Sequence, residues 1–204
     1  GTVTGVQTCA LPISNLSEQD FNVLYEAWLQ HCVLVIRQQS LTQQSLVDFS
    51  QRLGELELPP GSETRVTGDG GASLPEIWTI SNVKVNGEAI GALGNLEADW
   101  HSDMSYTSTP PRLTMLYSLE IPCDAEGRPK GDTLFASAVA AYASLDEATR
   151  RHIDALRAVH DFAAKKRGVK KAVVLTKEQI ALNPPVIRSE EHTSELQSQF
   201  RISY

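Results

Sequence analysis

The sequence is poor in basic residues and contains no long apolar run. Lysine and arginine number 18 against 25 aspartates and glutamates, which gives a formal net charge of -7. Phosphate binding requires a concentrated excess of basic side chains on one face, so this balance predicts no nucleic-acid partner. The one basic run, at 165–171, is short and typical of a solvated helix end or loop, with an anion-binding patch as the alternative. No segment is apolar over the length that a bilayer requires, so no membrane partner is expected.

Cysteine is also scarce. Cys9, Cys32 and Cys123 form an odd set without C-x-x-C spacing, which indicates neither a disulfide framework nor a zinc site. This usage predicts a reducing, cytoplasmic location. Cys32 begins the apolar run 32–36, where a small buried hydrophobic side chain is expected rather than a nucleophile.

The two ends of the chain lack the periodicity of the middle. Residues 1–14 and 188–204 show neither a helical period nor a strand alternation. Both also resemble peptides translated from sequencing-adapter DNA. We therefore expect a non-native leader at 1–14, one folded domain at 15–187 and a non-native tail at 188–204. Flexible native termini are the alternative.

The first part of the domain shows a helix, a strand and a second helix. Ser17 and Asp20 precede an apolar stripe at helical spacing, which predicts a capped helix that reaches Leu29. The β-branched run 32–36 predicts a buried strand. A second helix is expected to carry Leu46, Phe49 and Leu53 on one face and to stop at Gly54, before a loop at 59–71.

Further along, strands are expected at 77–81, 112–119 and 133–136, with an extended segment at 100–106. The 112–119 strand is expected to be buried on both faces, because Leu116 interrupts its alternation.

Two local signals accompany these strands. Asn86-Gly87 predicts a hairpin turn. Ser144 and Glu147 predict a capping box for a helix whose apolar face continues to Val159. The irregular order of strands and helices favours a mixed α/β, β-rich fold with peripheral helices.

Trp100-His101-Ser102-Asp103 is the segment that can carry chemistry. On a strand, side chains alternate, so His101 and Asp103 would leave the same face with backbones roughly 7 Å apart and could reach one ion. One histidine, one carboxylate and a second histidine form the facial triad of non-haem iron(II) enzymes. The H-x-D pattern alone is weak, because it is expected by chance in roughly one in four chains of this length.

The surrounding residues resemble the taurine dioxygenase family, the TauD/TfdA-like enzymes. The resemblance rests on Trp100-His101-Ser102-Asp103, on Pro110-Pro111 and on Gly131-Asp132-Thr133-Leu134-Phe135, in that order and spacing. Lys130 stands where the family has the first glycine of the last motif. With RLGELELPP upstream and Asn183-Pro184-Pro185-Val186 downstream, the resemblance covers about 15–187.

This resemblance implies a double-stranded β-helix, a cupin-like jelly roll, of which 15–187 would be an incomplete part. It implies that His101 and Asp103 bind iron(II), and that Thr133 binds the cosubstrate 2-oxoglutarate through its hydroxyl. It also implies that oxygen and a small organic molecule, such as a sulfonate, sulfate or aryloxy acid, are the other substrates. The family's distal histidine ligand and its 2-oxoglutarate-binding arginine would lie beyond Pro185, so the chain is expected to be an inactive fragment. Whether the intact enzyme forms a homo-oligomer is not determined by these residues.

Each of these assignments has an alternative without a catalytic role. His101 and Asp103 could form a simple hydrogen-bonded pair, and Thr133 could be an ordinary strand threonine. His160 is expected near a helix end in a structural role, and His31, His152 and His192 are poor candidates for a third ligand. Glu97 and Asp99 add negative charge before the ligands, which disfavours an anionic substrate unless a basic residue offsets it. A zinc-dependent hydrolase or lyase that uses His101 and Asp103, and a non-catalytic remnant of the fold, are the competing functions.

Overall fold

The computed structural model describes residues 6–8, 12–58, 74–93, 100–163, 177–189 and 199–202. Its helices are the 3-10 helix η1 (Ile13–Asn15), α1 (Glu18–His31), α2 (Gln43–Gln51), α3 (Ala138–Ala143), α4 (Glu147–Asp154) and α5 (Lys177–Leu182). Its strands are β1 (Val6–Thr8), β2 (Val33–Ile36), β3 (Ile80–Ser81), β4 (Lys84–Val85), β5 (Glu88–Ala89), β6 (Ala92–Leu93), β7 (Thr114–Tyr117), β8 (Arg157–His160), β9 (Val186–Ser189) and β10 (Gln199–Ile202).

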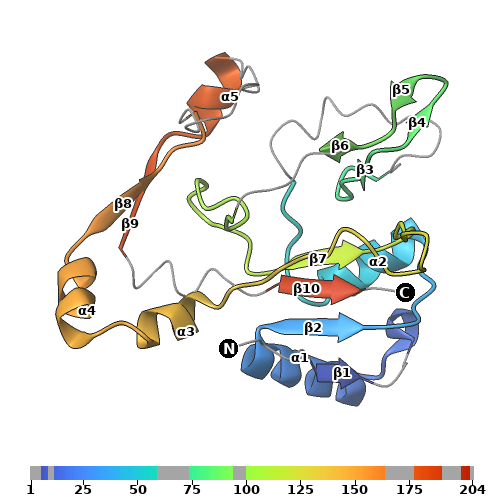
Figure 1. Cartoon of the computed structure of the whole chain (residues 1–204), viewed down its shortest axis with the longest axis horizontal. Helices are drawn as coiled ribbons and strands as arrows, with labels where there is room; N and C mark the ends of the chain where they lie inside the picture. The colour runs from blue at the N-terminus through green and yellow to red at the C-terminus, as the bar shows by residue number, and fades with distance from the viewer. Residues whose placement is uncertain are drawn as a thin grey trace.

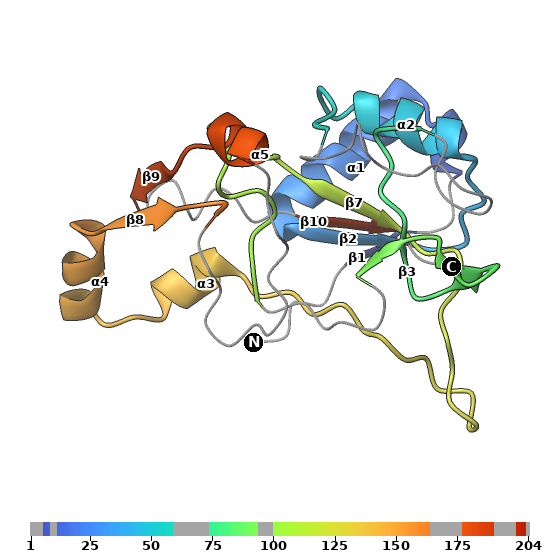
Figure 2. The ribbon, with the colours of Figure 1, turned by 90° about the horizontal axis from the view of Figure 1, so that it is seen from above.

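A parallel sheet with two helices on one face is the centre of the fold. The strand order is β1-β2-β10-β7, and each neighbouring pair runs parallel (Figure 1). Helices α1 and α2 lie together on the same side of this sheet (Figure 2). An arm made of α3, α4, β8, α5 and β9 extends away from the sheet.

Helix α1 forms as the sequence predicts. The Ser17 hydroxyl accepts the Asp20 backbone N–H and donates to the Asp20 carboxylate, so the first turn is capped. The helix ends at His31 because Cys32 adopts a left-handed conformation with φ of 62°. The predicted strand therefore begins at Val33 instead of Cys32, and Cys32 is half-buried as a helix C-cap rather than a fully buried strand residue.

The hydrophobic core lies between these two helices and β2. Its members are buried apolar side chains from η1, α1, β2 and α2, namely Ile13, Phe21, Leu24, Trp28, Leu34, Ile36 and Phe49. Alternation along β2 sends every second side chain towards the helices, and Leu34 and Ile36 are 0% and 1% exposed. Helix α2 ends at Gln51, so Leu53, expected on its face, lies in the following turn but still packs against the core.

Strand β7 is tied to this core over a long sequence distance. Met115 and Tyr117 pack against the core cluster. The Tyr117 hydroxyl accepts the backbone N–H of Leu41 at 3.0 Å and lies 3.4 Å from the carbonyl oxygen of Gln39. The predicted strand at 112–119 is thus confirmed over its central residues, all of which are half-buried.

Two strands of the central sheet come from the terminal segments. β1 lies within 1–14 and β10 lies within 188–204, and both pair with β2. Both segments were expected to lie outside the folded domain, so half of the strands of this sheet were not predicted. The non-native origin of the two segments stays a prediction.

A tight hairpin forms where Asn86-Gly87 predicts it. β4 and β5 pair antiparallel across these two residues, whose φ angles are 53° and 85°. Positive φ at both central positions is what a type I′ turn requires, and asparagine and glycine tolerate it. The strand expected at 77–81 is reduced to its last two residues, β3, which pairs with β6.

The arm departs from the sequence predictions at three points. The segment 133–136 is not a strand, because no described strand pairs with it and an unpaired strand is not stable in isolation. Helix α4 is capped by Asp146 rather than Ser144, since the Asp146 carboxylate accepts the Thr149 N–H at 2.8 Å and Ser144 already ends α3. The helix stops at Asp154, so Val159 and His160 belong to β8 and not to a helix or its end.

The structure confirms a mixed α/β fold, but with little sheet. Described strands contain two to four residues each, so the β-rich character that we expected is not seen in the described part of the chain. No described helix is both long and apolar enough to cross a bilayer. Several predictions fall outside the described residues, namely those on Cys9, the loop at 59–71, Glu97, Asp99, the basic run at 165–171 and His192.

Candidate metal centre

The segment that carries the predicted ligands is a turn and not a strand. Residues 103–106 form a turn in which Met104 has a φ of 47°. The backbone N–H and the hydroxyl of Thr107 both donate to the Met104 carbonyl, at 3.0 and 2.9 Å. The extended geometry predicted for 100–106 is therefore wrong, because these local hydrogen bonds satisfy the backbone without a neighbouring strand.

The turn nevertheless brings the two predicted ligands together. Nε2 of His101 lies 3.1 Å from Oδ1 of Asp103. The two side chains are 49% and 32% exposed, so the pair is open to solvent and to an incoming ion. Side-chain alternation on a strand would have given the same pairing by a different route.

The second oxygen of Asp103 is already occupied. The Thr114 hydroxyl, at the start of β7, donates to Oδ2 of Asp103 at 2.6 Å. Asp103 thus presents one oxygen to Thr114 and the other to His101. Nothing in the sequence singles out Thr114, because a threonine is an ordinary strand residue.

The separation of the two donor atoms suits a shared metal ion. Histidine nitrogen and carboxylate oxygen bind a divalent transition metal at about 2.1 Å, so two ligands at a right angle lie about 3.0 Å apart. The observed separation of 3.1 Å meets this requirement. Without a metal, a proton on Nε2 can bridge the same two atoms, and metal binding would replace that proton. His101 and Asp103 therefore fit two positions of an iron(II) centre.

A third ligand is not found in the described part of the chain, where no group of three His, Cys, Asp or Glu side chains has metal-binding geometry. His160 contacts the turn at 103–106, but through its Nδ1, which lies 3.0 Å from the Ser105 hydroxyl. Its Nε2 is buried without a hydrogen-bond partner. The expected structural role of His160 agrees with this contact, although the residue sits in a strand.

The far side of the turn packs against β8 and β9. Arg188 of β9 is 7% exposed, and its guanidinium donates to the carbonyl oxygens of Ser105 and Thr107. The Tyr106 ring stacks on Phe162 with centroids 4.6 Å apart. Burial, and then the nearby Asp103 carboxylate, raise the pKa of the Tyr106 phenol. Tyr106 therefore stays neutral beside the ligand pair.

Thr133, the predicted cosubstrate ligand, is exposed on the segment that leads to α3. No described contact joins it to the His101–Asp103 pair. Its cosubstrate role stays a prediction.

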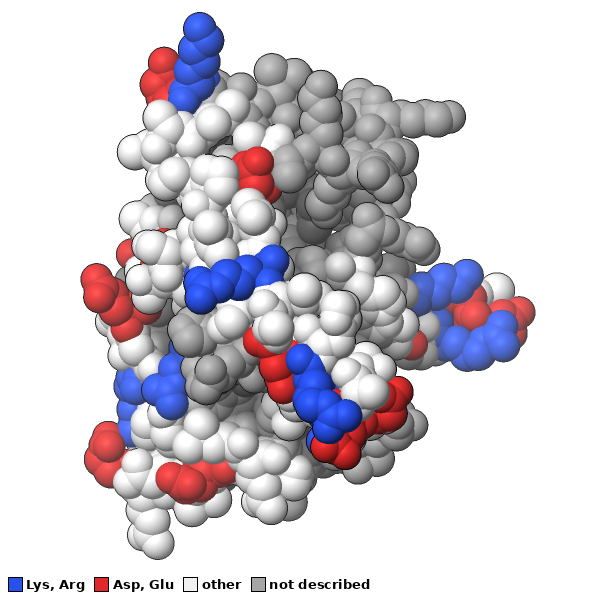
Figure 3. Space-filling view, turned by 90° about the vertical axis from the view of Figure 1, so that its left-hand side faces the viewer, with Lys and Arg blue, Asp and Glu red and all other residues white. Residues whose placement is uncertain are grey.

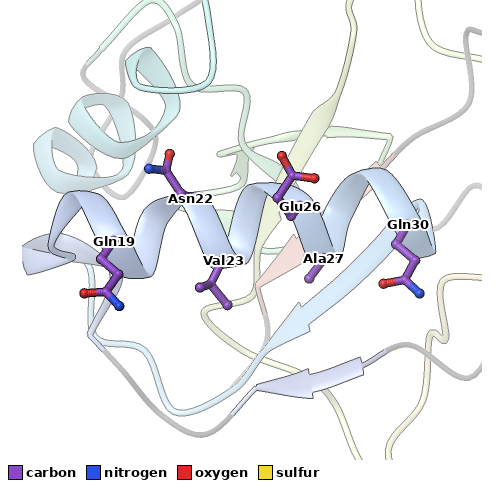
Figure 4. A pocket seen from close by; sticks show the side chains of 6 residues that line it. All are labelled: Gln19, Asn22, Val23, Glu26, Ala27 and Gln30. Atoms are coloured by element: carbon purple, nitrogen blue, oxygen red, sulfur yellow. The ribbon is translucent and has the colours of Figure 1, made fainter.

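Neither of two hollows on the described surface is lined by His101 or Asp103. One hollow runs along α1, and all of its described lining residues belong to that helix (Figure 4). On the face drawn in Figure 3, basic side chains lie beside acidic ones instead of gathering into one basic area. Arg128 pairs with Asp124 and Glu126.

Comparison with known protein families identifies the family to which the chain belongs. The family model described as taurine catabolism dioxygenase TauD, TfdA family, matches residues 4–202. The chain belongs to the TauD/TfdA family. This family consists of alpha-ketoglutarate-dependent dioxygenases, and the ligand segment at 100–103 lies inside the matched region.

Curated relatives agree with this assignment. The chain is 31% identical to the (S)-phenoxypropionate/alpha-ketoglutarate-dioxygenase of Delftia acidovorans, over 78% of this chain and 50% of that protein. It is 33% identical to the alpha-ketoglutarate-dependent 2,4-dichlorophenoxyacetate dioxygenase of a Burkholderia species, over 64% of this chain and 44% of that protein. It is 28% identical to the alpha-ketoglutarate-dependent sulfate ester dioxygenase of Pseudomonas putida, over 72% and 42%. The chain thus spans about half the length of the curated relatives it matches.

Proposed function

We propose that the intact TauD/TfdA enzyme to which this chain belongs uses iron(II) and 2-oxoglutarate to hydroxylate a small organic acid. The observation that supports this most directly is the 3.1 Å separation between Nε2 of His101 and Oδ1 of Asp103, in a turn that exposes both groups. The relatives named above act on phenoxy acids and on sulfate esters. We therefore propose an aryloxy acid, a sulfate ester or a sulfonate as the substrate class. The double-stranded β-helix of the family is proposed for the intact domain.

The residues of this chain would hold and orient the metal. His101 and Asp103 would occupy two adjacent coordination positions, leaving the remaining ones to a further protein ligand and to the cosubstrates. Iron(II) with 2-oxoglutarate and oxygen would supply the oxidising chemistry, in which 2-oxoglutarate would be converted to succinate and carbon dioxide and the substrate would be hydroxylated. Thr133 would donate a hydrogen bond to a 2-oxoglutarate carboxylate. Because Cys32 and Cys123 are free thiols, we also propose a reducing, cytoplasmic setting.

The test uses the full-length protein that contains residues 15–187, with His101→Ala and Asp103→Ala variants. Succinate formation is measured with iron(II), 2-oxoglutarate, oxygen and one member each of the aryloxy acids, sulfate esters and sulfonates. We expect both substitutions to abolish iron binding and succinate formation together, because two ligands do not hold the facial geometry. Folding, followed by circular dichroism, should survive. Near-wild-type succinate production by either variant would disprove the ligand assignment.

Two other outcomes would point to the competing functions. Activity with zinc in the absence of 2-oxoglutarate would indicate a metal-dependent hydrolase or lyase. A full-length protein that binds iron and 2-oxoglutarate but forms no succinate with any substrate class would indicate a non-catalytic remnant.

For the 204-residue chain by itself we propose an inactive fragment. Its described residues include no group of three side chains that could hold a metal ion, and it spans about half the length of its curated relatives. We expect no 2-oxoglutarate-dependent oxygen consumption when iron(II) is added, as measured with an oxygen electrode. Oxygen uptake accompanied by stoichiometric succinate would contradict this proposal.

A further inference from the structure

We propose that Thr114 is a positioning residue that fixes Asp103 as a single-oxygen metal ligand directed at the same ion as His101. This inference rests on the proposed function, because it concerns the same metal centre. It names a residue outside the ligand motif, eleven positions further along the chain, as the determinant of carboxylate orientation.

The contact itself has the character of a strong hydrogen bond. The Thr114 hydroxyl donates to Oδ2 of Asp103 at 2.6 Å, and both side chains are half-buried. Hydrogen bonds from a hydroxyl to an ionised carboxylate are short at this distance and stronger than neutral ones. Partial burial protects the bond from competing water.

The donor is held still by its strand. Side chains alternate along β7, so Met115 and Tyr117 face the core while Thr114 faces the opposite side. Core packing of Met115 and the hydrogen bond of Tyr117 to the Leu41 N–H therefore fix the backbone that carries Thr114. A β-branched residue on a fixed backbone has few side-chain rotamers, so the hydroxyl position is well defined.

The acceptor needs such a fixed point. Asp103 lies in a half-buried turn whose own hydrogen bonds run between Met104 and Thr107 and do not involve the carboxylate. A carboxylate can bind a metal through one oxygen or both. The hydrogen bond from Thr114 holds Oδ2 on the strand side and directs Oδ1 towards Nε2 of His101. Partners of this kind orient the ligands of metal sites, and their loss weakens metal binding about 10- to 100-fold.

Mn(II) binding to the full-length protein that contains residues 15–187 tests this role, with free Mn(II) measured by electron paramagnetic resonance. Thr114→Val keeps the shape of the side chain but removes the donor, and we expect it to weaken Mn(II) binding at least about tenfold. Thr114→Ser keeps the hydroxyl and should stay within about threefold of wild type, because the donor is retained. Wild-type affinity in Thr114→Val, or an equal loss in Thr114→Ser, would overturn the proposal.

Thr149→Val is the matched control. The Thr149 hydroxyl also donates to an aspartate, Asp146, at 3.0 Å, but at the start of α4 and away from the ligand pair. The same chemical change at Thr149 should leave Mn(II) affinity unchanged. A loss there equal to that in Thr114→Val would mean that the effect is not specific to the site.

A metal-free measurement separates failure of this inference from failure of the proposed function. If the wild-type full-length protein and its Asp103→Asn variant show the same lack of Mn(II) binding, the metal assignment fails. The infrared carboxylate band of Asp103, isolated as the difference between wild type and Asp103→Asn, then still reports on the contact. We expect Thr114→Val to shift that band and Thr114→Ser to leave it in place. An unshifted band in Thr114→Val would overturn the positioning role.

Discussion

Removing the Tyr117 hydroxyl should lower the stability of the chain without affecting metal binding. This hydroxyl accepts the Leu41 N–H at 3.0 Å and joins β7 to the segment between β2 and α2. Leaving a buried donor unpaired costs about 1–3 kcal/mol. Both residues are only partly buried, so water can replace part of the lost bond. We therefore expect Tyr117→Phe to lower the free energy of unfolding by about 1 kcal/mol, the lower end of that range.

Urea unfolding, followed by tryptophan fluorescence, measures this change, since Trp28 is 1% exposed and reports on the core. A loss of about 1 kcal/mol corresponds to a fall of about 2–4 °C in the melting temperature for a chain of this size. Tyr142→Phe is the matched control, because its hydroxyl donates to Asp154 on the exposed surface, and we expect a change within about 0.5 kcal/mol. Tyr117 faces away from Thr114 on the strand, so Mn(II) affinity should not move. A stability change indistinguishable from the control, or a parallel loss of Mn(II) affinity, would refute this reasoning.

Two further predictions concern the cosubstrate and the pH dependence of the arm. In the full-length protein, Thr133→Val should weaken 2-oxoglutarate binding by about 1–3 kcal/mol while iron still binds. The affinity is measured by titrating the metal-to-ligand charge-transfer absorbance. An unchanged affinity would mean that Thr133 is a structural residue. The Thr149 backbone N–H lowers the pKa of the Asp146 carboxyl below its ordinary value of 3.8, so the cap of α4 contributes stability above that pH and loses it as pH falls further. Asp146→Asn should keep the cap but remove this pH dependence. Amide exchange in α4, measured from about pH 5 down to about pH 2, would detect the difference between the two proteins.

Local signals predicted the structure well where they acted within a few residues. The Ser17 cap and the Asn86-Gly87 turn each require only neighbouring backbone groups, and both form as expected. The start of α4 was missed because Ser144 and Asp146 are both competent caps, and the choice between them depends on where α3 ends. The prediction of a strand at 133–136 was wrong for a related reason, since a strand depends on a partner that its own residues do not specify.

The candidate site shows the same division between local and long-range information. The pairing of His101 with Asp103 could be predicted from their types and spacing, but its geometry could not. A strand and a turn both allow the two side chains to meet, and the left-handed φ of Met104 selects the turn. The contact of Thr114 with Asp103 could not be predicted from the sequence. Strand alternation tells which face the hydroxyl occupies but not which residue packs on that face.

The contacts that hold the Asp103 carboxylate come from the turn itself and from β7. The turn is closed by Thr107 on Met104, and the Asp103 carboxylate is held by Thr114. Strand β7 in turn takes its position from the core of α1, α2 and β2 through Met115 and Tyr117. From beyond Tyr117, Arg188 and His160 bind the same turn through Ser105 and Thr107. We therefore expect the His101–Asp103 pair to form as a preorganised half-site, to which a third ligand is added, rather than to be assembled by the metal from a disordered segment.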